Sequence, residues 1–365
     1  MGIAPSFGIL PLSMASRLSQ APTRIRAANN PVCGCVRTRL LAATLAVGVL
    51  VPACGGDSGG GVPRSRTLSP SPSPSGSASP TTSPVTVIDR IRVASQPDPV
   101  LFVDGSIWVG HYDVNGLERV DPTTGKVVAK IAVRSPIDLV EAFGSIWAAE
   151  LNSDTVARVD PGTNAILDRI PVGYYPDGIT AGFGAVWAVN QYDASLSRID
   201  PTTGEVTETY DVGDTPLYAT AAFGSIWVTD TQNDLVYRID PRSGKTLATV
   251  KTDIVPLHVL GAYGSLWVTT FESGTLQRID PDTNAVIGTV EIGYGADGLI
   301  ANAGDLFVVT DRDDTIVRID PDDMEVLQTW QLETQPHNGV FVQGSFWTAA
   351  FDDGSLLRLD LGLSE

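Results

Sequence analysis

The side chains best suited to acid–base or metal chemistry in this 365-residue chain fall into two groups that recur along the sequence. The chain has three histidines, and each of them belongs to one of these groups. Imidazole and carboxylate side chains can exchange protons near neutral pH and can ligate divalent cations. The first group comprises Asp98, Asp138, Asp177, Tyr218, His258, Asp297 and His337, and the second includes His111, Glu150 and Asp230. We regard them all as candidate ligand-binding residues.

A repeat of about 40 residues determines where these side chains lie. A Gly-x-x-aromatic segment recurs seven times, from residues 105–108 to residues 344–347. A proline stands eight residues before the glycine in six repeats, and an arginine stands fourteen residues after it in all seven. The segments between turn signals such as Asp-Pro-Thr-Thr-Gly are short and rich in β-branched residues, which is typical of strands. Four such strands in each repeat indicate a propeller blade.

The two ends of the repeat array complement each other. The last repeat stops after Asp360, before its fourth strand, whereas residues 85–93 form a spare strand ahead of the first repeat. We expect residues 85–93 to complete the last blade, which closes the ring and leaves no open edge. The sequence therefore predicts an all-β fold, a seven-bladed β-propeller of four-stranded blades over residues 85–365. Six tryptophans and Phe307 are expected to fill the wedges between blades.

Both groups of candidate residues should lie at one face of such a ring, around its central channel. The first group follows the proline column at the start of each innermost strand, and the second stands three residues after the aromatic, where the next strand ends. Other columns repeat nearly unchanged, but these two vary, so packing does not dictate them. We expect pairs within blades, namely Asp138 with Glu150, His258 with Glu272, and His111 with Asp98. Asp138 and Glu150 are the candidate ligands for a weakly bound Mg²⁺ or Ca²⁺. The alternative is a solvated mouth without a ligand.

The charge and cysteine content exclude some functions. The chain has 42 acidic against 24 basic residues, a net charge of −18, so we expect no nucleic-acid partner. All three cysteines precede residue 85, so the predicted ring contains no disulfide and must hold by packing between blades. We expect a monomer.

The N-terminal segment has the pattern of a secretory signal. An Arg-Thr-Arg segment is followed by the apolar residues 40–53, a run that is short for a membrane span. We take residues 1–53 as a signal region, with the true start of translation near Val36 or Met14.

The junction Val-Pro-Ala-Cys at residues 51–54 resembles a bacterial lipoprotein signal. That resemblance implies a lipidated Cys54, whose two acyl chains would anchor the protein stably to a membrane. Residues 54–84 are rich in Gly, Ser and Pro, which predicts a disordered tether. We therefore expect the protein in the cell envelope, at the outer face of the cytoplasmic membrane. An ordinary signal or an uncleaved anchor is the alternative.

The repeat at residues 224–245, Gly-Ser-Ile-Trp-Val-Thr-Asp through Val-Tyr-Arg-Ile-Asp-Pro-Arg-Ser-Gly-Lys, resembles YVTN/YncE-like and virginiamycin B lyase-like propellers. The resemblance covers the whole ring, and such repeats serve enzymes, sensor domains and envelope lipoproteins alike. The lyase resemblance implies a Mg²⁺-dependent elimination that opens a cyclic ester, with a histidine from an inner strand and a glutamate from the next strand. No blade here offers that pair at matching columns.

These observations favour a function in binding over one in catalysis. We expect an extracytoplasmic, lipid-anchored propeller that acts as a ligand-binding or protein-interaction module, with a small molecule or an envelope protein as its partner. The alternative is a metal-assisted lyase of the virginiamycin B lyase type, or a related hydrolase.

Overall fold

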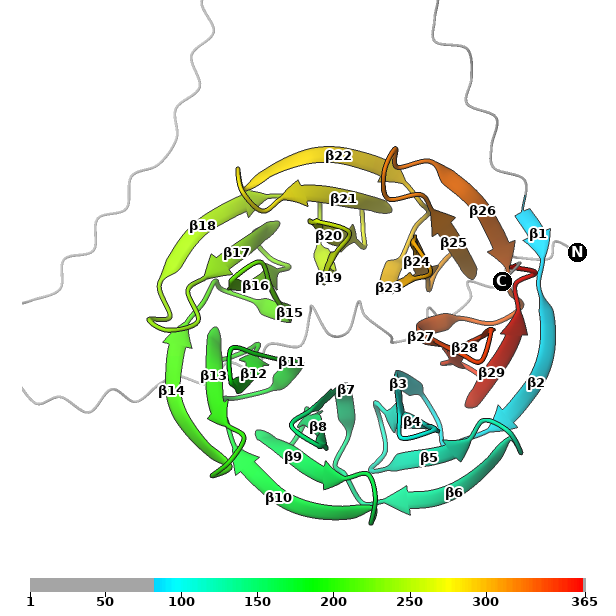
Figure 1. Ribbon diagram of the computed structural model, residues 1–365, viewed down its shortest axis with the longest axis horizontal. Coiled ribbons are helices and arrows are strands. Elements are labelled where there is room, and N and C mark those ends of the chain that lie inside the picture. The colour runs from blue at the N-terminus through cyan, green and yellow to red at the C-terminus, as the bar shows by residue number, and fades with distance from the viewer. Residues whose placement is uncertain (1–81, 364–365) are drawn as a thin grey trace, which may run out of the picture. The chain divides into compact units, whose positions relative to one another are not determined.

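The structure is a computed structural model that describes residues 82–363, all of which lie in strands, turns, bends or irregular segments. Its 29 strands pair into seven sheets arranged around one axis, which confirms the predicted seven-bladed propeller (Figure 1). From the axis outwards, the strands are, in blade 1, β3 (Pro97–Val103), β4 (Ser106–His111), β5 (Leu117–Asp121) and β6 (Lys126–Ile131); in blade 2, β7 (Pro136–Ala142), β8 (Ser145–Glu150), β9 (Thr155–Asp160) and β10 (Ala165–Pro171); in blade 3, β11 (Pro176–Gly182), β12 (Ala185–Asn190), β13 (Ser195–Asp200) and β14 (Glu205–Asp211); in blade 4, β15 (Pro216–Ala222), β16 (Ser225–Asp230), β17 (Leu235–Ile239) and β18 (Thr246–Lys251); in blade 5, β19 (Pro256–Ala262), β20 (Ser265–Thr270), β21 (Thr275–Asp280) and β22 (Ala285–Glu291); in blade 6, β23 (Ala296–Asn302), β24 (Asp305–Thr310), β25 (Thr315–Ile319), β26 (Val326–Gln331) and β1 (Thr82–Pro84); and in blade 7, β27 (Pro336–Val342), β28 (Ser345–Ala350), β29 (Ser355–Asp360) and β2 (Thr86–Arg92).

The ring closes through β2, as the sequence predicts. This strand pairs antiparallel with β29 from Thr86 opposite Asp360 to Arg92 opposite Ser355 (Figure 1). Ile91 and Val93 are each 8% exposed and belong to the apolar cluster between blades 7 and 1. The N-terminal strand therefore supplies both a hydrogen-bonded edge and part of the core, which links the two ends of the array.

The extra strand β1 differs from the sequence prediction, which places residues 82–84 in the tether. Thr82 to Pro84 pair in parallel with Thr329 to Gln331 on the outer edge of blade 6. The composition of this segment gave no strand signal, because Ser, Thr and Pro are typical of linkers. Proline is nevertheless tolerated on an edge strand, where its missing N–H need not take part in a ladder.

The aromatic column forms the core between blades. Trp108, Trp147, Trp187, Trp227 and Trp267 have no exposed surface, and Trp347 and Phe307 are 1% exposed. The indole N–H groups of the first five donate to the backbone carbonyl five residues earlier, at 3.0 to 3.4 Å. These bonds satisfy a polar group that would otherwise be buried without a partner.

The arginine column ties neighbouring blades together. Arg158 Nε donates to Ser145 Oγ in its own blade at 2.9 Å, and its Nη1 donates to the Pro201 carbonyl of the next blade at 2.9 Å. The guanidinium carbon lies 5.0 Å from the Trp147 ring centroid, which adds a cation–π contact. Arg119, Arg238 and Arg278 repeat this arrangement. The column is therefore structural.

Residues 82–363 contain no helix long and apolar enough to cross a membrane. The signal region, Cys54 and the tether up to residue 81 lie outside the described residues.

Candidate functional site

The innermost strands all begin at one end of the ring axis, which we call the mouth. In each blade, the residue before the innermost strand accepts a backbone hydrogen bond from the residue after the second strand, at 2.8 to 3.2 Å. Examples are Gln191 N to Tyr175 O in blade 3 and Phe351 N to Gln335 O in blade 7, both at 3.0 Å. The seven bonds hold the loops of the mouth in equivalent positions, so the blades differ there only in their side chains.

A β-bulge follows the first residue of every innermost strand. In blade 3, for example, the register between β11 and β12 shifts between Pro176 and Ile179, and the other six blades shift at the same place. A bulge re-aims the side chains of the residues that it contains. The first candidate group occupies these bulges, and we call it the floor: Asp98, Asp138, Asp177, Tyr218, His258, Asp297 and His337.

The structure joins part of the floor into one network that spans blades 5, 6, 7 and 1. His258 Nδ1 lies 3.0 Å from Asp297 Oδ1, and Asp297 Oδ2 lies 3.6 Å from His337 Nδ1. Asp98 Oδ1 lies 3.6 Å from that same imidazole nitrogen. His337 is 1% exposed and Asp297 is 2% exposed, so the ionic contacts are shielded from water. The predicted floor residues therefore meet, but across blades rather than within them.

The network favours protonated imidazoles. Burial opposes the charged form of His258, but the contact with Asp297 and the charges of Asp138 and Asp98 outweigh it and raise the His258 pKa above its usual value. His337 behaves likewise, since burial is outweighed by Asp98 and Asp297 and its pKa is raised. Aromatic rings complete both sites, with Tyr218 stacked on His258 at 4.0 Å and Phe351 stacked on His337 at 4.2 Å between ring centroids.

Asp138 lies beside this network. Its Oδ2 accepts a hydrogen bond from Ile179 N of blade 3 at 2.8 Å, and its Oδ1 accepts one from Leu139 N. Burial raises the Asp138 pKa to about 7 in spite of these bonds and of His258, and the charge of Asp177 adds to the increase. A carboxyl group with such a pKa can gain or lose a proton at neutral pH, as a general acid or base must.

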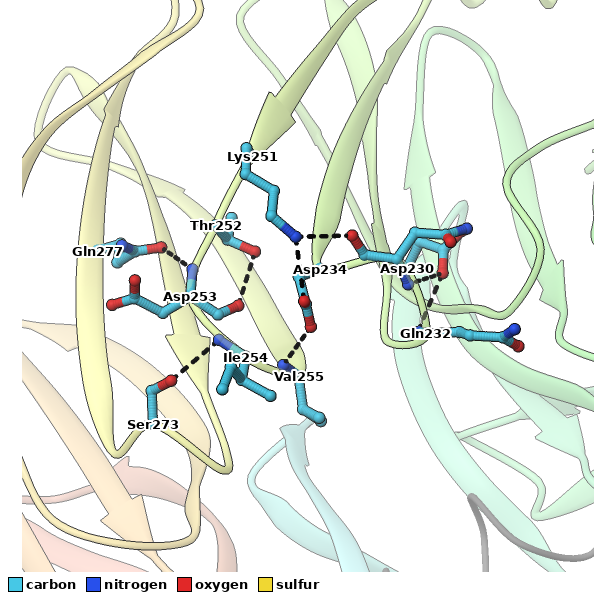
Figure 2. A network of polar contacts seen from close by, with 11 residues as sticks. Asp230, Gln232, Asp234, Lys251, Thr252, Asp253, Ile254, Val255, Ser273 and Gln277 are labelled. Atoms are coloured by element: carbon cyan, nitrogen blue, oxygen red, sulfur yellow. Dashed lines mark hydrogen bonds and ion pairs between the residues drawn. The ribbon is translucent and has the colours of Figure 1, made fainter. Parts of the chain in front are cut away.

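The second candidate group does not join the floor. Strand side chains alternate between faces, and Thr229 Oγ1 of blade 4 donates to Leu257 O of blade 5, so the adjacent Asp230 faces the other side of its sheet. Asp230 is fully buried and accepts backbone N–H groups from Asp214 and Gln232. Figure 2 shows this loop beside the Asp234–Lys251 ion pair, whose nitrogen and oxygen are 3.0 Å apart. Asp230 therefore holds mouth loops in position.

Glu150 and His111 also serve their own blades. Glu150 is fully buried, and its carboxylate accepts bonds from Arg134 N at 2.8 Å, Thr155 Oγ1 at 2.5 Å and Arg169 Nε at 3.1 Å. Asp138 is opposite Ala149 in the ladder, so alternation places the Asp138 and Glu150 side chains on opposite faces of the sheet. The predicted pairing of these two carboxylates does not form.

The predicted pairing of His111 with Asp98 does not form either. His111 Nε2 instead lies 3.5 Å from Glu118 Oε2, inside blade 1. Burial would raise the Glu118 pKa, but His111 and Lys130, whose Nζ lies 2.6 Å from Oε1, lower it to about 2. The expected partner of His258 is also engaged elsewhere, because Glu272 accepts a bond from the Tyr294 hydroxyl at 2.9 Å.

The donor set does not fit a divalent cation. Within residues 82–363, no group of three or more His, Cys, Asp or Glu side chains could hold a metal ion. The Glu150 carboxylate is already bound by Arg169, Thr155 and a backbone N–H, and both Asp138 oxygens accept backbone N–H groups. The two proposed ligands are therefore occupied by the protein itself.

Aromatic residues above the floor are the part of the site that polarity-based sequence reasoning missed. Tyr112 and Phe351 directly follow second strands, as Gln191 does in blade 3, and Tyr175 directly precedes an innermost strand. Tyr112 and Phe351 have ring centroids 6.4 Å apart, and Tyr175 stacks on Tyr192 at 4.4 Å. The repeat register could have identified them, because each stands one position from a candidate column.

Comparison with known proteins supports the fold. No model of a known protein family matches the sequence, and no curated protein matches it. Among solved structures, selenomethionine-substituted virginiamycin B lyase from Staphylococcus aureus is similar, with 18% identity and a TM-score of 0.66. The alignment covers 75% of this chain and 98% of that chain. At this identity the likeness shows a shared seven-bladed propeller fold and nothing about the reaction.

Proposed function

We propose that the mouth of the ring binds a small molecule and that the chain is a ligand-binding module. The observation that carries this proposal is the network of His258, Asp297, His337 and Asp98. Removing charged groups from water is costly unless they are well paired, and the 3.6 Å contacts of His337 are longer than hydrogen bonds. Buried ionisable groups with shifted pKa values are typical of functional sites.

The repeat supports this interpretation over a purely structural one. All seven blades have the same bulge and the same backbone bond at the mouth, yet blade 4 places Tyr218 where blade 5 places His258. A blade therefore folds without a histidine or carboxylate at this position, and the framework does not require the network.

A thermal-shift and NMR screen of small molecules against the full chain tests this proposal. Asp297→Asn and His337→Asn should weaken any ligand that binds at the mouth by at least about tenfold, the loss of a charged hydrogen bond. Asp234→Asn is the matched control, because this carboxylate lies at a mouth loop but pairs with Lys251 away from the floor. Ligands whose affinity is the same in all three variants would place binding elsewhere and refute the proposal.

We further propose that the module is displayed at the outer face of the cytoplasmic membrane through a lipidated Cys54. The apolar run before Cys54 supports this location, and the acidic ring is suited to a soluble domain outside the membrane. In this setting an envelope protein is the alternative partner. Intact-mass measurement of protein from the membrane fraction would reveal the acyl chains, and retention of residues 1–53 would contradict the anchor.

A second candidate function is a lyase or hydrolase that works by acid–base chemistry. The contact of 3.0 Å between His258 Nδ1 and Asp297 Oδ1 favours it, because a carboxylate that orients an imidazole leaves Nε2 to exchange a proton with a substrate. Since Asp138 and Glu150 do not fit a metal ion, no metal-dependent step follows from this site. Ring-opening of a macrocyclic ester that is lost in His258→Ala and in His337→Ala would establish catalysis.

A further inference from the structure

The floor of the mouth is divided into two halves of different charge. Blades 1, 2 and 3 contribute three carboxyl side chains, Asp98, Asp138 and Asp177, which we call the acidic half. Both histidines of the floor, His258 and His337, come from blades 5 and 7. Asp177 has no exposed surface, and its charge raises the pKa values of Asp138, Tyr175 and Tyr192, so these groups lie close together. A ligand above the acidic half would experience a negative potential.

Four tyrosines, Tyr112, Tyr174, Tyr175 and Tyr192, gather above the same half, and we call them the tyrosine arc. Tyr192 stacks on Tyr175 at 4.4 Å between ring centroids and lies 5.6 Å from Tyr174. Tyr112 of blade 1 forms a hydrogen bond with Tyr175 of blade 3 across the mouth of blade 2. All four side chains are partly exposed, so ring surface remains open to a ligand.

A buried amide without a partner adjoins the arc. Gln191 is 1% exposed, and neither its Oε1 nor its Nε2 forms a hydrogen bond within residues 82–363. In the repeat, Gln191 and Asp177 occupy the positions of Phe351 and His337, whose rings stack at 4.2 Å. The Gln191 side chain is therefore directed to the floor beside Asp177. An unsatisfied buried amide calls for an explanation, and a bound polar group supplies one.

Blade 6 shows how this propeller binds a cation at the equivalent place. The guanidinium carbon of Arg312 lies 4.7 Å from the ring centroids of both Phe271 and Tyr294, and Glu272 pairs with it at 3.7 Å. Tyr294 is the repeat equivalent of Tyr174, and both backbone N–H groups donate to an aspartate of the next loop at 2.7 Å.

The position of Arg312 is taken by Tyr192 in blade 3. Blade 3 thus keeps the aromatic ring and the acidic surroundings but supplies no cation of its own at this position. The two blades share a backbone framework and differ in whether a basic side chain is built in.

We propose that the tyrosine arc and the acidic half of the floor bind an organic cation, of the quaternary ammonium or guanidinium class. This inference rests on the proposed function of the mouth and specifies its ligand. Aromatic faces attract cations with an exposed apolar shell, and neighbouring carboxylates supply the counter-charge. An anionic ligand would face three carboxyl groups, and an inorganic cation would gain little from tyrosine rings.

Calorimetric titration of the full chain with choline tests the proposal, in parallel with the uncharged isostere in which carbon replaces nitrogen. Choline should bind, and the isostere should bind at least about tenfold more weakly, because it lacks the charge that the rings and carboxylates attract. Methylguanidinium, which reproduces the head of Arg312, should compete with choline. Equal affinity of choline and its isostere would overturn the proposal.

Variants locate the site. Tyr192→Ala should weaken choline about tenfold, Tyr192→Phe should retain the affinity within about threefold because the ring remains, and Asp177→Asn should weaken it. The matched control is Tyr263→Ala, since Tyr263 is 40% exposed and its hydroxyl binds the turn at Gly304 of blade 6, at the opposite ends of the strands. Unchanged affinity in Tyr192→Ala would place any choline site elsewhere and overturn the proposal.

The same titration separates this inference from the proposed function. Absence of choline binding overturns the cation inference. If a ligand from the screen still binds and is weakened by His337→Asn, the mouth is a binding site for another chemistry and the proposed function survives. If no ligand of any class depends on the floor residues, both fail.

Discussion

Replacing Asp138 with asparagine should change the pH dependence of folding in a direction that the structure determines. The Asp138 pKa rises from 3.8 to about 7 on folding, so the folded state holds this proton more tightly than the unfolded state. Between these two values, unfolding releases a proton, and raising the pH therefore lowers the stability of the wild type. Above about pH 7 both states are ionised and the contribution of Asp138 stays constant.

The size of the effect follows from the shift. Each pH unit between the two pKa values changes the free energy of unfolding by about 1.4 kcal/mol, so the span from about pH 5 to about pH 8 is worth at most about 3 kcal/mol. Asparagine has one acceptor oxygen for the two N–H groups, of Leu139 and Ile179, that Asp138 binds, which costs about 1 kcal/mol at every pH. Asp138→Asn should therefore be about 1 kcal/mol less stable than wild type near pH 5 and up to about 2 kcal/mol more stable near pH 8.

Urea denaturation of wild type and variant across this pH range measures the crossing. A second readout is the His258 pKa from NMR, which should fall in the variant because Asp138 contributes to its increase. Asp234→Asn controls for the general effect of removing a carboxylate near the mouth. Parallel pH profiles for wild type and Asp138→Asn would refute the reasoning, because a purely hydrogen-bonding role costs the same at every pH.

Three further outcomes are expected. Deleting residues 55–81 should leave the melting temperature unchanged, whereas deleting residues 55–93 should remove β2, expose the edge of β29 and cause aggregation in a light-scattering assay; equal melting temperatures would contradict closure. Cys54→Ala should move the protein from the membrane fraction to the soluble or unprocessed pool on a blot, and persistent membrane association would exclude the lipid anchor. Trp267→Ala should lower the free energy of unfolding by about 3–5 kcal/mol in urea denaturation, because this ring is fully buried between blades.

The fold could be predicted because its signals are local and repeated. Turn chemistry at each Asp-Pro, a large aromatic such as Trp147 and an arginine such as Arg158 recur in register, and each has one partner that the period itself defines. The closure by residues 85–93 followed from counting strands. The pairing of Thr82–Pro84 with β26 did not, because it depends on an unfilled sheet edge far away in sequence.

The site could be predicted only in part. The floor column was found because Asp297 and His337 stand at fixed distances from the repeat signals, but their meeting depends on how blades 6 and 7 approach each other, which no spacing encodes. The bulge was not visible in the sequence, and without it Asp138 and Glu150 looked like neighbours. Tyr192 was missed because the search was for ionisable groups, whereas its contribution is a ring face.

The bulge at the start of each innermost strand has a consequence for how this molecule can change. The backbone bonds that hold the bulge do not involve the side chain it presents, and the seven blades carry aspartate, tyrosine or histidine there on one framework. The mouth is thus a circular array of seven independently exchangeable positions. Mutational drift or deliberate randomisation at these positions can alter what is bound while the ring continues to fold, so binding specificity and stability can be selected separately.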